Sequence, residues 1–175
     1  MEIVTPLSHA LVEEHIRNAP LLQHPEAKPY SESEIHIAQL AIKDIRPCAF
    51  YVLKDRLGML EGLNQFLVSG GFDMHGLGLE ENICGLQILD GPHFYTLIPP
   101  IVEYHRGVYM LIDGRHRIYG ARKSGKEKVS CLVISTKKNF YPLPFLPNPN
   151  SWDDISVVGP NSIPSPRKLY KPGEE

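Results

Sequence analysis

Apolar residues recur at three- and four-residue steps in parts of the chain, a pattern that predicts amphipathic helices. The clearest case spans Lys54 to Ser69, where the repeating residues are Leu57, Leu60, Leu63 and Leu67. Gly70-Gly71 then ends this helix. We expect an earlier helix over 6–19, with Thr5 as N-cap and Pro6 at the first helical position, and another from His116 to Ser124 that stops at Gly125.

Alternating or continuous apolar runs predict strands at 35–42, 94–103, 108–112 and 129–135. The first run leads into a turn at Asp44-Ile45-Arg46-Pro47, and Arg106-Gly107 makes a tight turn between the second and third. Short helices and strands are therefore mixed along the chain. We expect an α/β (α+β) single domain with a small mixed sheet flanked by helices.

Proline marks the end of the compact fold. Of 16 prolines, 8 fall within residues 142–172. We therefore divide the chain into an N-terminal helix and loop (1–34), a folded domain (35–140) and an extended Pro-rich tail (141–175). We expect the tail to lie over the domain surface with Trp152 as an anchor, to offer a docking site for a protein partner, and to be disordered beyond Gly159.

Composition fits one ordinary globular domain, since the 175 residues are 42% hydrophobic and 22% charged. No apolar run approaches the roughly 18 residues of a membrane span, and the start lacks a signal-peptide pattern. We expect a soluble, cytoplasmic protein that does not contact a membrane. Cys48, Cys84 and Cys131 are widely spaced, so we expect all three to be buried and reduced.

Charge is unevenly distributed along the chain. Residues 1–103 carry 14 acidic and 6 basic residues, whereas residues 104–128 carry 7 basic and 2 acidic ones. A general nucleic-acid binder needs a broad positive surface, because affinity comes from many phosphate contacts. A small phosphate ligand needs only one local cluster, so the short basic stretch favours the small ligand and makes DNA a less favoured partner.

The basic stretch contains the segment Asp113-Gly114-Arg115-His116-Arg117, between a predicted strand and a predicted helix. A helix start offers unpaired N–H groups and the positive end of its dipole, which favour an anion. Gly114 allows a close approach to the backbone, and the three following side chains add donors. The alternative is that Asp113 only caps the helix, the arginines are solvated and His116 packs against the sheet.

This order of residues resembles the core motif of the ParB/sulfiredoxin superfamily, a hydrophobic strand, a Gly-x-His/Arg-Arg turn, a helix and a final strand. The resemblance continues upstream in Ile45-Arg46-Pro47, in the 54–69 helix and in Pro99-Pro100-Ile101-Val102. It covers about residues 35–135, with an unusual insertion around 70–93. We interpret the glycine-rich segment 70–78 as a mobile lid or part of this insertion. The resemblance implies a ParB/sulfiredoxin-like fold.

The superfamily binds a nucleoside triphosphate at this turn, so the resemblance implies that Gly114, Arg115, His116 and Arg117 contact phosphates. Sulfiredoxins carry their catalytic cysteine where this chain has Arg115, which disfavours sulfinic acid reduction. The DNA-clamping partition proteins have Glu-Arg-Arg after the glycine. The motif is most similar to that of the free serine kinase type, Asp-Gly-His-His-Arg, with only the first histidine replaced.

The resemblance therefore implies ATP or CTP and Mg²⁺ as cofactors, with Asp113 and His116 as catalytic candidates and Asp113 as metal ligand or base. Arg46, Lys54 and Arg56 are additional candidate phosphate contacts. The kinase branch also uses an upstream glutamate as base, for which Glu32, Glu34 and Asp44 are candidates by position. Each of these is also explained as an ordinary surface residue.

Other polar residues give weaker signals. Asp73 and His75 could ligate a metal from one segment, but no third ligand accompanies them. His36, His93 and His105 are interpreted as structural histidines.

We expect Mg²⁺-dependent phosphoryl transfer from a nucleoside triphosphate to a small hydroxyl metabolite. The alternatives are a nucleotide-gated regulator without enzymatic activity, a ParB-like DNA-interacting domain and, least favoured, a nuclease. The sequence leaves open the acceptor, the preferred nucleotide (ATP or CTP) and the catalytic base. It also leaves open the oligomeric state, whether the site is active, and the role of the insertion.

Overall fold

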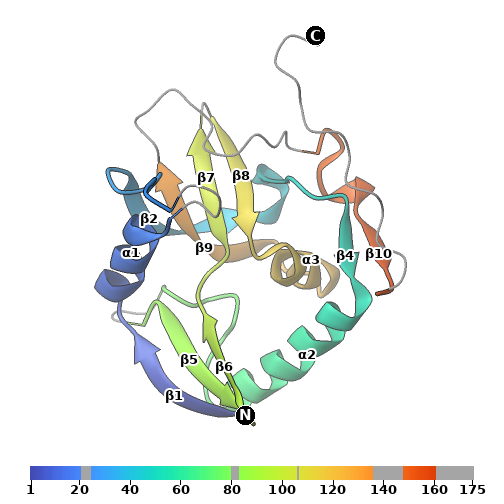
Figure 1. Cartoon of the computed structure of the whole chain (residues 1–175). Helices are drawn as coiled ribbons and strands as arrows, with labels where there is room; N and C mark the ends of the chain where they lie inside the picture. Colours follow the sequence, from blue (N-terminus) through green and yellow to red (C-terminus); the bar gives the residue numbers. More distant parts are fainter. Residues whose placement is uncertain (21–24, 80–82, 106, 136–147, 161–175) are drawn as a thin grey trace.

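A five-stranded mixed sheet lies at the centre of the fold, in the order β2-β9-β7-β8-β3 (Figure 1). The computed structural model describes residues 1–20, 25–79, 83–105, 107–135 and 148–160. The strands are β2 (Glu34–Ala41), β3 (Ile45–Pro47), β7 (Ile101–His105), β8 (Val108–Asp113) and β9 (Lys128–Ser135). β7 is antiparallel to β8 but parallel to β9, and β3 is parallel to β8. The predicted mixed sheet is confirmed, and the expected turn at 45–47 is a short strand.

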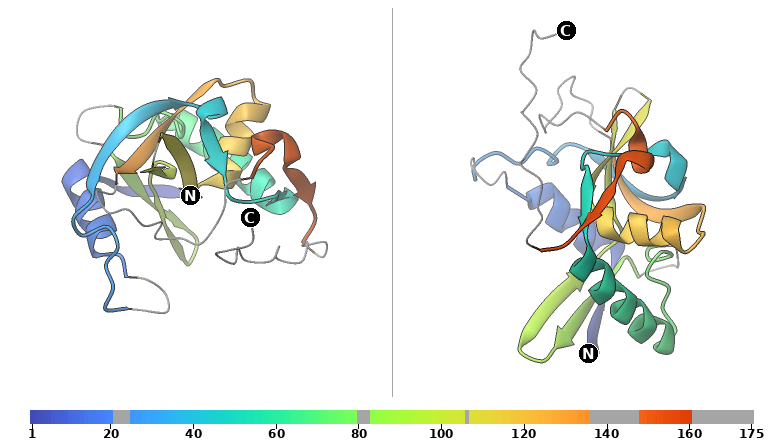
Figure 2. Two further views of the ribbon diagram at one scale, coloured as in Figure 1. Left: turned by 90° about the horizontal axis from the view of Figure 1, so that it is seen from above. Right: turned by 90° about the vertical axis from the view of Figure 1, so that its right-hand side faces the viewer.

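Side chains alternate between the two faces of this sheet along each strand, and a helix packs on each face. α3 (Arg115–Lys123) packs on one face, where its Ile118 and Ala121 join Val133 of β9 in the main core. On the other face, Val12 of α1 (His9–Asn18) packs with Ile134 of β9. Figure 2 shows α1 and α3 on opposite sides of the strands.

A second sheet joins the N-terminus to the insertion. β1 (Glu2–Leu7), β5 (Gly85–Asp90) and β6 (His93–Leu97) form an antiparallel sheet in the order β1-β5-β6. α2 (Lys54–Ser69), confirmed at its predicted position, supplies Leu67 to the core under this sheet. The insertion thus contributes β5, the central strand of this sheet, and the strand predicted at 94–103 is two strands of different sheets, separated at residues 98–100.

The helix predicted over 6–19 is wrong at its start. Thr5 and Pro6 lie in β1, opposite Gln87 and Leu86 of β5. Ser8 is the N-cap instead, and its Oγ accepts a hydrogen bond from the Leu11 N–H at 3.3 Å. β1 is an edge strand, where a proline without an N–H group is tolerated.

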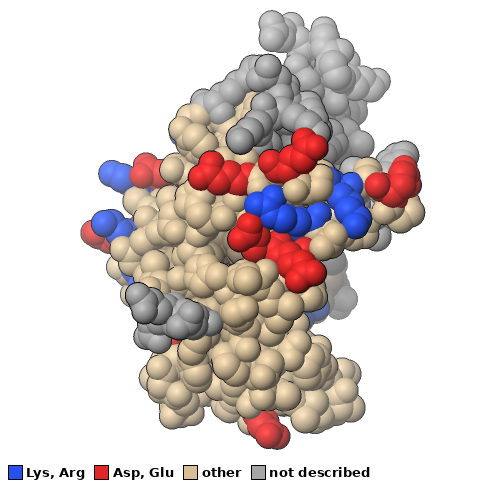
Figure 3. Space-filling model, turned by 90° about the vertical axis from the view of Figure 1, so that its left-hand side faces the viewer, with Lys and Arg blue, Asp and Glu red and all other residues tan. Residues whose placement is uncertain are grey.

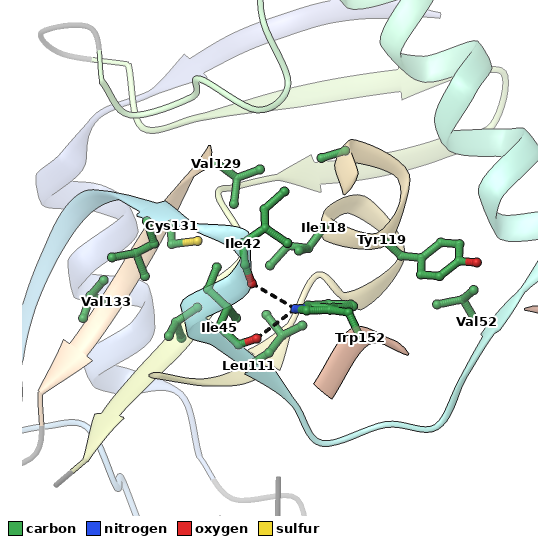
Figure 4. Packing of buried hydrophobic residues seen from close by; sticks show 13 residues of the cluster. Ile42, Ile45, Val52, Leu111, Ile118, Tyr119, Val129, Cys131, Val133 and Trp152 are labelled. Atoms are coloured by element: carbon green, nitrogen blue, oxygen red, sulfur yellow. Dashed lines mark hydrogen bonds between the residues drawn. The ribbon is translucent and has the colours of Figure 1, made fainter. Parts of the chain in front are cut away.

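The C-terminal part returns to the core. A short 3-10 helix (Ser151–Asp154) leads into β10 (Ser156–Val158), which runs parallel to β4 (Tyr51–Leu53). Trp152 is 3% exposed in the main core, which confirms the predicted anchor (Figure 4). The expectations for 141–147 and for disorder beyond Gly159 fall almost wholly outside the described residues.

Cys84 and Cys131 are buried, but Cys48 is only half-buried, which corrects the expectation for that residue. All three thiols are free. Within the described part of the chain, no helix is long and apolar enough to cross a membrane.

Acidic and basic side chains lie close together on the face that carries α1, and among the residues drawn in colour the lower part of that face has few charges (Figure 3). Two oppositely charged side chains of α1 form an ion pair, with Arg17 Nη2 at 2.7 Å from Glu13 Oε1. The described residues of this face therefore form no broad positive area.

Candidate functional site

The turn after β8 is built around Gly114, which is the N-cap of α3. Its φ of +95° lies in the left-handed region that disfavours L side chains. A Cβ atom there would lie 2.8 Å from Pro100 Cβ and 3.1 Å from Arg117 Nη2. Pro100 therefore occupies the space that a side chain at position 114 would need. This packing explains why the position is a glycine without invoking a bound ligand.

Gly114→Ala is expected to lower the free energy of unfolding by about 2–3 kcal/mol, because the residue would combine a left-handed backbone with a clash against Pro100. Urea denaturation followed by circular dichroism measures this loss. Gly125→Ala serves as the control: Gly125 also has a positive φ, of 80°, but a Cβ atom there would meet nothing within 4 Å. Equal losses in the two variants would show that Pro100 contributes nothing.

Asp113 and Arg117 form an ion pair across the turn. Arg117 Nη2 lies 3.1 Å from Asp113 Oδ2, and Arg117 Nη1 donates to the backbone carbonyl of Ile98. The Arg117 side chain is only 11% exposed, whereas that of Asp113 is 66% exposed. The alternatives in which Asp113 caps the helix and Arg117 is solvated are both wrong: Gly114 is the cap, and burial lowers the pKa of the inward-facing Arg117.

His116 links the start of α3 to the start of α2. Its Nε2 accepts a hydrogen bond from the backbone N–H of Leu53 at 3.0 Å, so the ring proton of the neutral form is on Nδ1. Burial, followed by the positive charges of Arg115 and Arg56, lowers the pKa of His116 to about 4. The imidazole is therefore neutral at neutral pH, and it contacts the α2 start, which the alternative of packing against the sheet did not anticipate.

The depressed pKa of His116 predicts a pH dependence of stability. The unfolded histidine takes up a proton near pH 6.5 and the folded one near pH 4, so this contribution to stability is lost as pH falls from about 6.5 to 4. Chemical denaturation at several pH values should show a steeper loss in the native protein than in His116→Gln, whose amide oxygen can still accept from Leu53. Parallel pH profiles for the two proteins would contradict the assignment.

Arg115 lies half-buried beside the same junction. Its guanidinium carbon is 5.0 Å from the centroid of the Tyr51 ring, and within the described ranges it has no ion-pair partner. Lys54 and Arg56 are exposed in the first turn of α2, and the Arg56 charge acts on His116. We call Leu53, Lys54, Arg56, Arg115 and His116 the helix junction. Of the predicted phosphate contacts, the structure thus brings together Lys54, Arg56, Arg115 and His116.

The remaining candidates lie elsewhere. Arg46 lines a hollow of about 530 Å³ beside the C-terminal segment, together with Pro149, Asn150, Ser151, Asp153 and Asp154. Glu32 and Glu34 precede or begin β2, three strands from β8 in the sheet order, and Asp44 ends the short helix after β2. All three acids are exposed.

Asp73 and His75 form a local loop contact. The His75 N–H donates to Asp73 Oδ1 at 2.9 Å, and Lys126 Nζ pairs with Asp73 Oδ2 at 3.3 Å. Among the residues that the structure describes, no three His, Cys, Asp or Glu side chains form a metal-binding group. Of the histidines interpreted as structural, His36 and His93 are exposed and His105 is buried.

Sequence reasoning missed Glu103, which is 1% exposed in β7. Its Oε1 accepts a hydrogen bond from the Tyr30 hydroxyl at 2.5 Å, and burial raises the pKa of this carboxyl group. The neighbouring Val102 faces α3, so alternation directs Glu103 to the opposite face of the sheet. A single acid within the apolar run 101–104 was the available signal.

A family profile described as the ParB CE domain matches residues 10–156. The chain belongs to the ParB CE domain family. The match spans α2, α3, nearly all of α1 and the whole five-stranded sheet, and it confirms the ParB-like superfamily predicted from the motif at 113–117. No curated protein matches the ParB CE chain.

Solved structures similar to this ParB CE chain share little sequence with it. A conserved hypothetical protein from Pyrococcus furiosus is 13% identical and aligns over 59% of this chain and 34% of its own, with a TM-score of 0.34. Protein Atu1540 from Agrobacterium tumefaciens is 15% identical over 62% and 43%, with a TM-score of 0.36. A free serine kinase mutant in complex with AMP is 12% identical over 63% and 34%, with a TM-score of 0.34. The ParB CE chain spans less than half the length of each.

Proposed function

We propose that the helix junction binds the phosphates of a nucleoside triphosphate, ATP or CTP, and that the protein transfers a phosphoryl group to a small hydroxyl metabolite with Mg²⁺. The observation that carries the proposal is the meeting of two helix starts, joined by the 3.0 Å hydrogen bond between Leu53 N–H and His116 Nε2. Each helix start directs N–H groups and a positive dipole end outward.

Basic side chains surround this junction. Arg115, Lys54 and Arg56 belong to the first turns of α3 and α2, where cations oppose the helix dipoles. A bound polyphosphate would remove that repulsion and accept charge-assisted hydrogen bonds from the same groups. His116 stays neutral here, so its part is to hold the two helix starts together, with Nδ1–H as its remaining donor.

Arg117 supports the turn from inside through Ile98 and Asp113, and the backbone N–H of Gly114 would join the phosphate site. Asp113 fits the requirement for a magnesium ligand, because its carboxylate is 66% exposed next to the junction. Proteins commonly hold Mg²⁺ through one or two carboxylates together with the substrate phosphates. The ion would neutralise charge on the transferring phosphoryl group.

The chain's own residues would then position the reactants. Arg115 would hold the terminal phosphates while the acceptor oxygen attacks the γ-phosphorus. The bond to the nucleoside diphosphate would break, and the Asp113 carboxylate would accept the hydroxyl proton as the alternative to its role as magnesium ligand.

Nucleotide turnover tests this proposal. The protein is incubated with Mg²⁺ and ATP or CTP, with and without a pool of small hydroxyl metabolites, and the release of ADP or CDP is measured. Acceptor-dependent release that is lost in Asp113→Asn supports transfer. Asp90→Asn is the matched control, because Asp90 lies at the end of β5 in the second sheet and pairs there with the N-terminal amine, at 3.8 Å. Equal rates in the native protein and Asp113→Asn would refute the catalytic role of Asp113.

The second candidate is a nucleotide-dependent regulator without transfer. It is favoured by the engagement of His116 Nε2 with Leu53 and of Asp113 with Arg117, which leaves the turn few groups for proton transfer. Thermal stabilisation by nucleotide without turnover would support it. Salt-sensitive retention on duplex DNA would instead favour a DNA-interacting domain.

A further inference from the structure

The C-terminal segment Asn148–Val158, which we call the strap, is fastened to the domain at several points. Trp152 Nε1 donates hydrogen bonds to the carbonyls of Ile42 and Ile45, at 3.1 and 2.8 Å, from within the main core (Figure 4). The Asn148 N–H donates to the Pro47 carbonyl at 2.7 Å. These contacts fix the strap beside the segment that runs from β3 into β4.

The strap also forms an ion pair with α3. Arg122, in the last turn of that helix, pairs with Asp153 at 2.6 Å. The strap is therefore tied to the same helix whose first turn carries Arg115 and His116.

β4 depends on the strap for its strand pairing. β10, the end of the strap, pairs with β4 in the register Ser156–Tyr51, Val157–Val52 and Val158–Leu53. In the described part of the chain, these two strands form a sheet of their own, with no third strand. The Ser156 N–H donates to the Phe50 carbonyl at 3.0 Å at the start of this pairing.

β4 in turn supplies two contacts of the helix junction. The Tyr51 ring lies against the Arg115 guanidinium, and the Leu53 N–H bonds to His116. Val52, between them, is 1% exposed in the main core. A continuous set of contacts thus runs from the strap through β4 to both side chains at the start of α3.

We propose that the strap is a positioning element of the helix junction, and that its pairing with β4 sets the orientation of Arg115 and His116 for polyphosphate. Release of β10 would let β4 move and separate Tyr51 from Arg115 and Leu53 from His116. The affinity for phosphate is then controlled from a segment that contains none of the junction's basic residues. The affinity part of this inference rests on the proposed phosphate-binding function, whereas the positional part does not.

Ser156→Pro tests the inference, because it removes the N–H that donates to Phe50 while changing a side chain that is exposed. Ser156→Ala is the matched control, since it keeps that N–H. A double variant, Ser156→Pro with Trp152→Phe, also removes the indole donor to favour release of β10, which is verified by amide hydrogen exchange at residues 157 and 158, since a proline at position 156 has no N–H. Affinity is measured with tripolyphosphate and ATP by calorimetry.

We expect release of β10 to weaken tripolyphosphate binding about five- to tenfold, as for the loss of one oriented hydrogen bond. Ring ¹⁵N spectra of His116 should change in the same variants, because Nε2 loses the Leu53 donor, and its titration should move up from a pKa of about 4 toward 6.5. Ser156→Ala should match the native protein in both measurements. An unchanged His116 spectrum and unchanged affinity with β10 released would overturn the inference.

If the native protein itself binds no polyphosphate, the proposed function fails while the His116 spectra still decide whether the strap positions the junction. A changed spectrum with unchanged affinity in a protein that does bind would refute the control of affinity.

Discussion

Replacing Arg115 with alanine is expected to weaken the binding of ATP or tripolyphosphate by about 10- to 100-fold, with little change in the free energy of unfolding. A charge-assisted hydrogen bond to phosphate contributes about 1.5–3 kcal/mol, which corresponds to that loss of affinity. The fold should tolerate the change, because Arg115 is only half-buried and the variant loses a single ring contact, the one with Tyr51. Calorimetric titration gives the affinity, and urea denaturation gives the stability.

Lys123→Ala is the matched control for Arg115→Ala. Lys123 also lies over a tyrosine, with its Nζ 5.5 Å from the Tyr119 ring, but it occupies the last turn of α3. The Lys123→Ala substitution removes one positive charge and one ring contact without changing the helix junction. A comparable loss of affinity in both variants would mean that net charge, and not the turn, governs binding.

Trp152→Ala is expected to lower the free energy of unfolding by about 3–5 kcal/mol, the usual range for removing a large buried aromatic side chain. The side chain is 3% exposed, and its indole N–H satisfies two backbone carbonyls that the variant would leave without this donor. Circular dichroism in urea is the suitable measurement, because Trp152 is the single tryptophan and its loss removes the fluorescence signal.

Val157→Ala shows what a surface change in the same segment does. Val157 is 48% exposed in β10, so its truncation should change stability by no more than about 0.5 kcal/mol. If Trp152→Ala were equally mild, the C-terminal segment would not be part of the core.

Periodicity predicted the long elements well. The 54–69 helix and the strand near 129–135 have patterns long enough to identify, and both are found. The failures lie where a distant partner decides the local structure. Pro6 reads as a helix start, but pairing with β5 makes it part of an edge strand. The three-residue strands β4 and β10 carry no periodic signal and exist because they pair with each other.

The candidate site shows the same division. The motif at 113–117 is continuous in sequence, so its place after a strand and at a helix start could be predicted. The direction of each side chain could not. Arg117 turns inward because the Ile98 carbonyl and Asp113 accept its donors, and His116 bonds to Leu53, 63 residues away.

The hydrogen bonds of Trp152 join residues 107 and 110 positions apart, which has a consequence for the order of folding during synthesis. Contacts of such long separation close large loops and form late. A nascent chain can complete α2, α3 and the central sheet before residues 148–158 leave the ribosome. Until that moment β4 has no strand beside it, so the basic turn is finished only after residues 148–158 have been made.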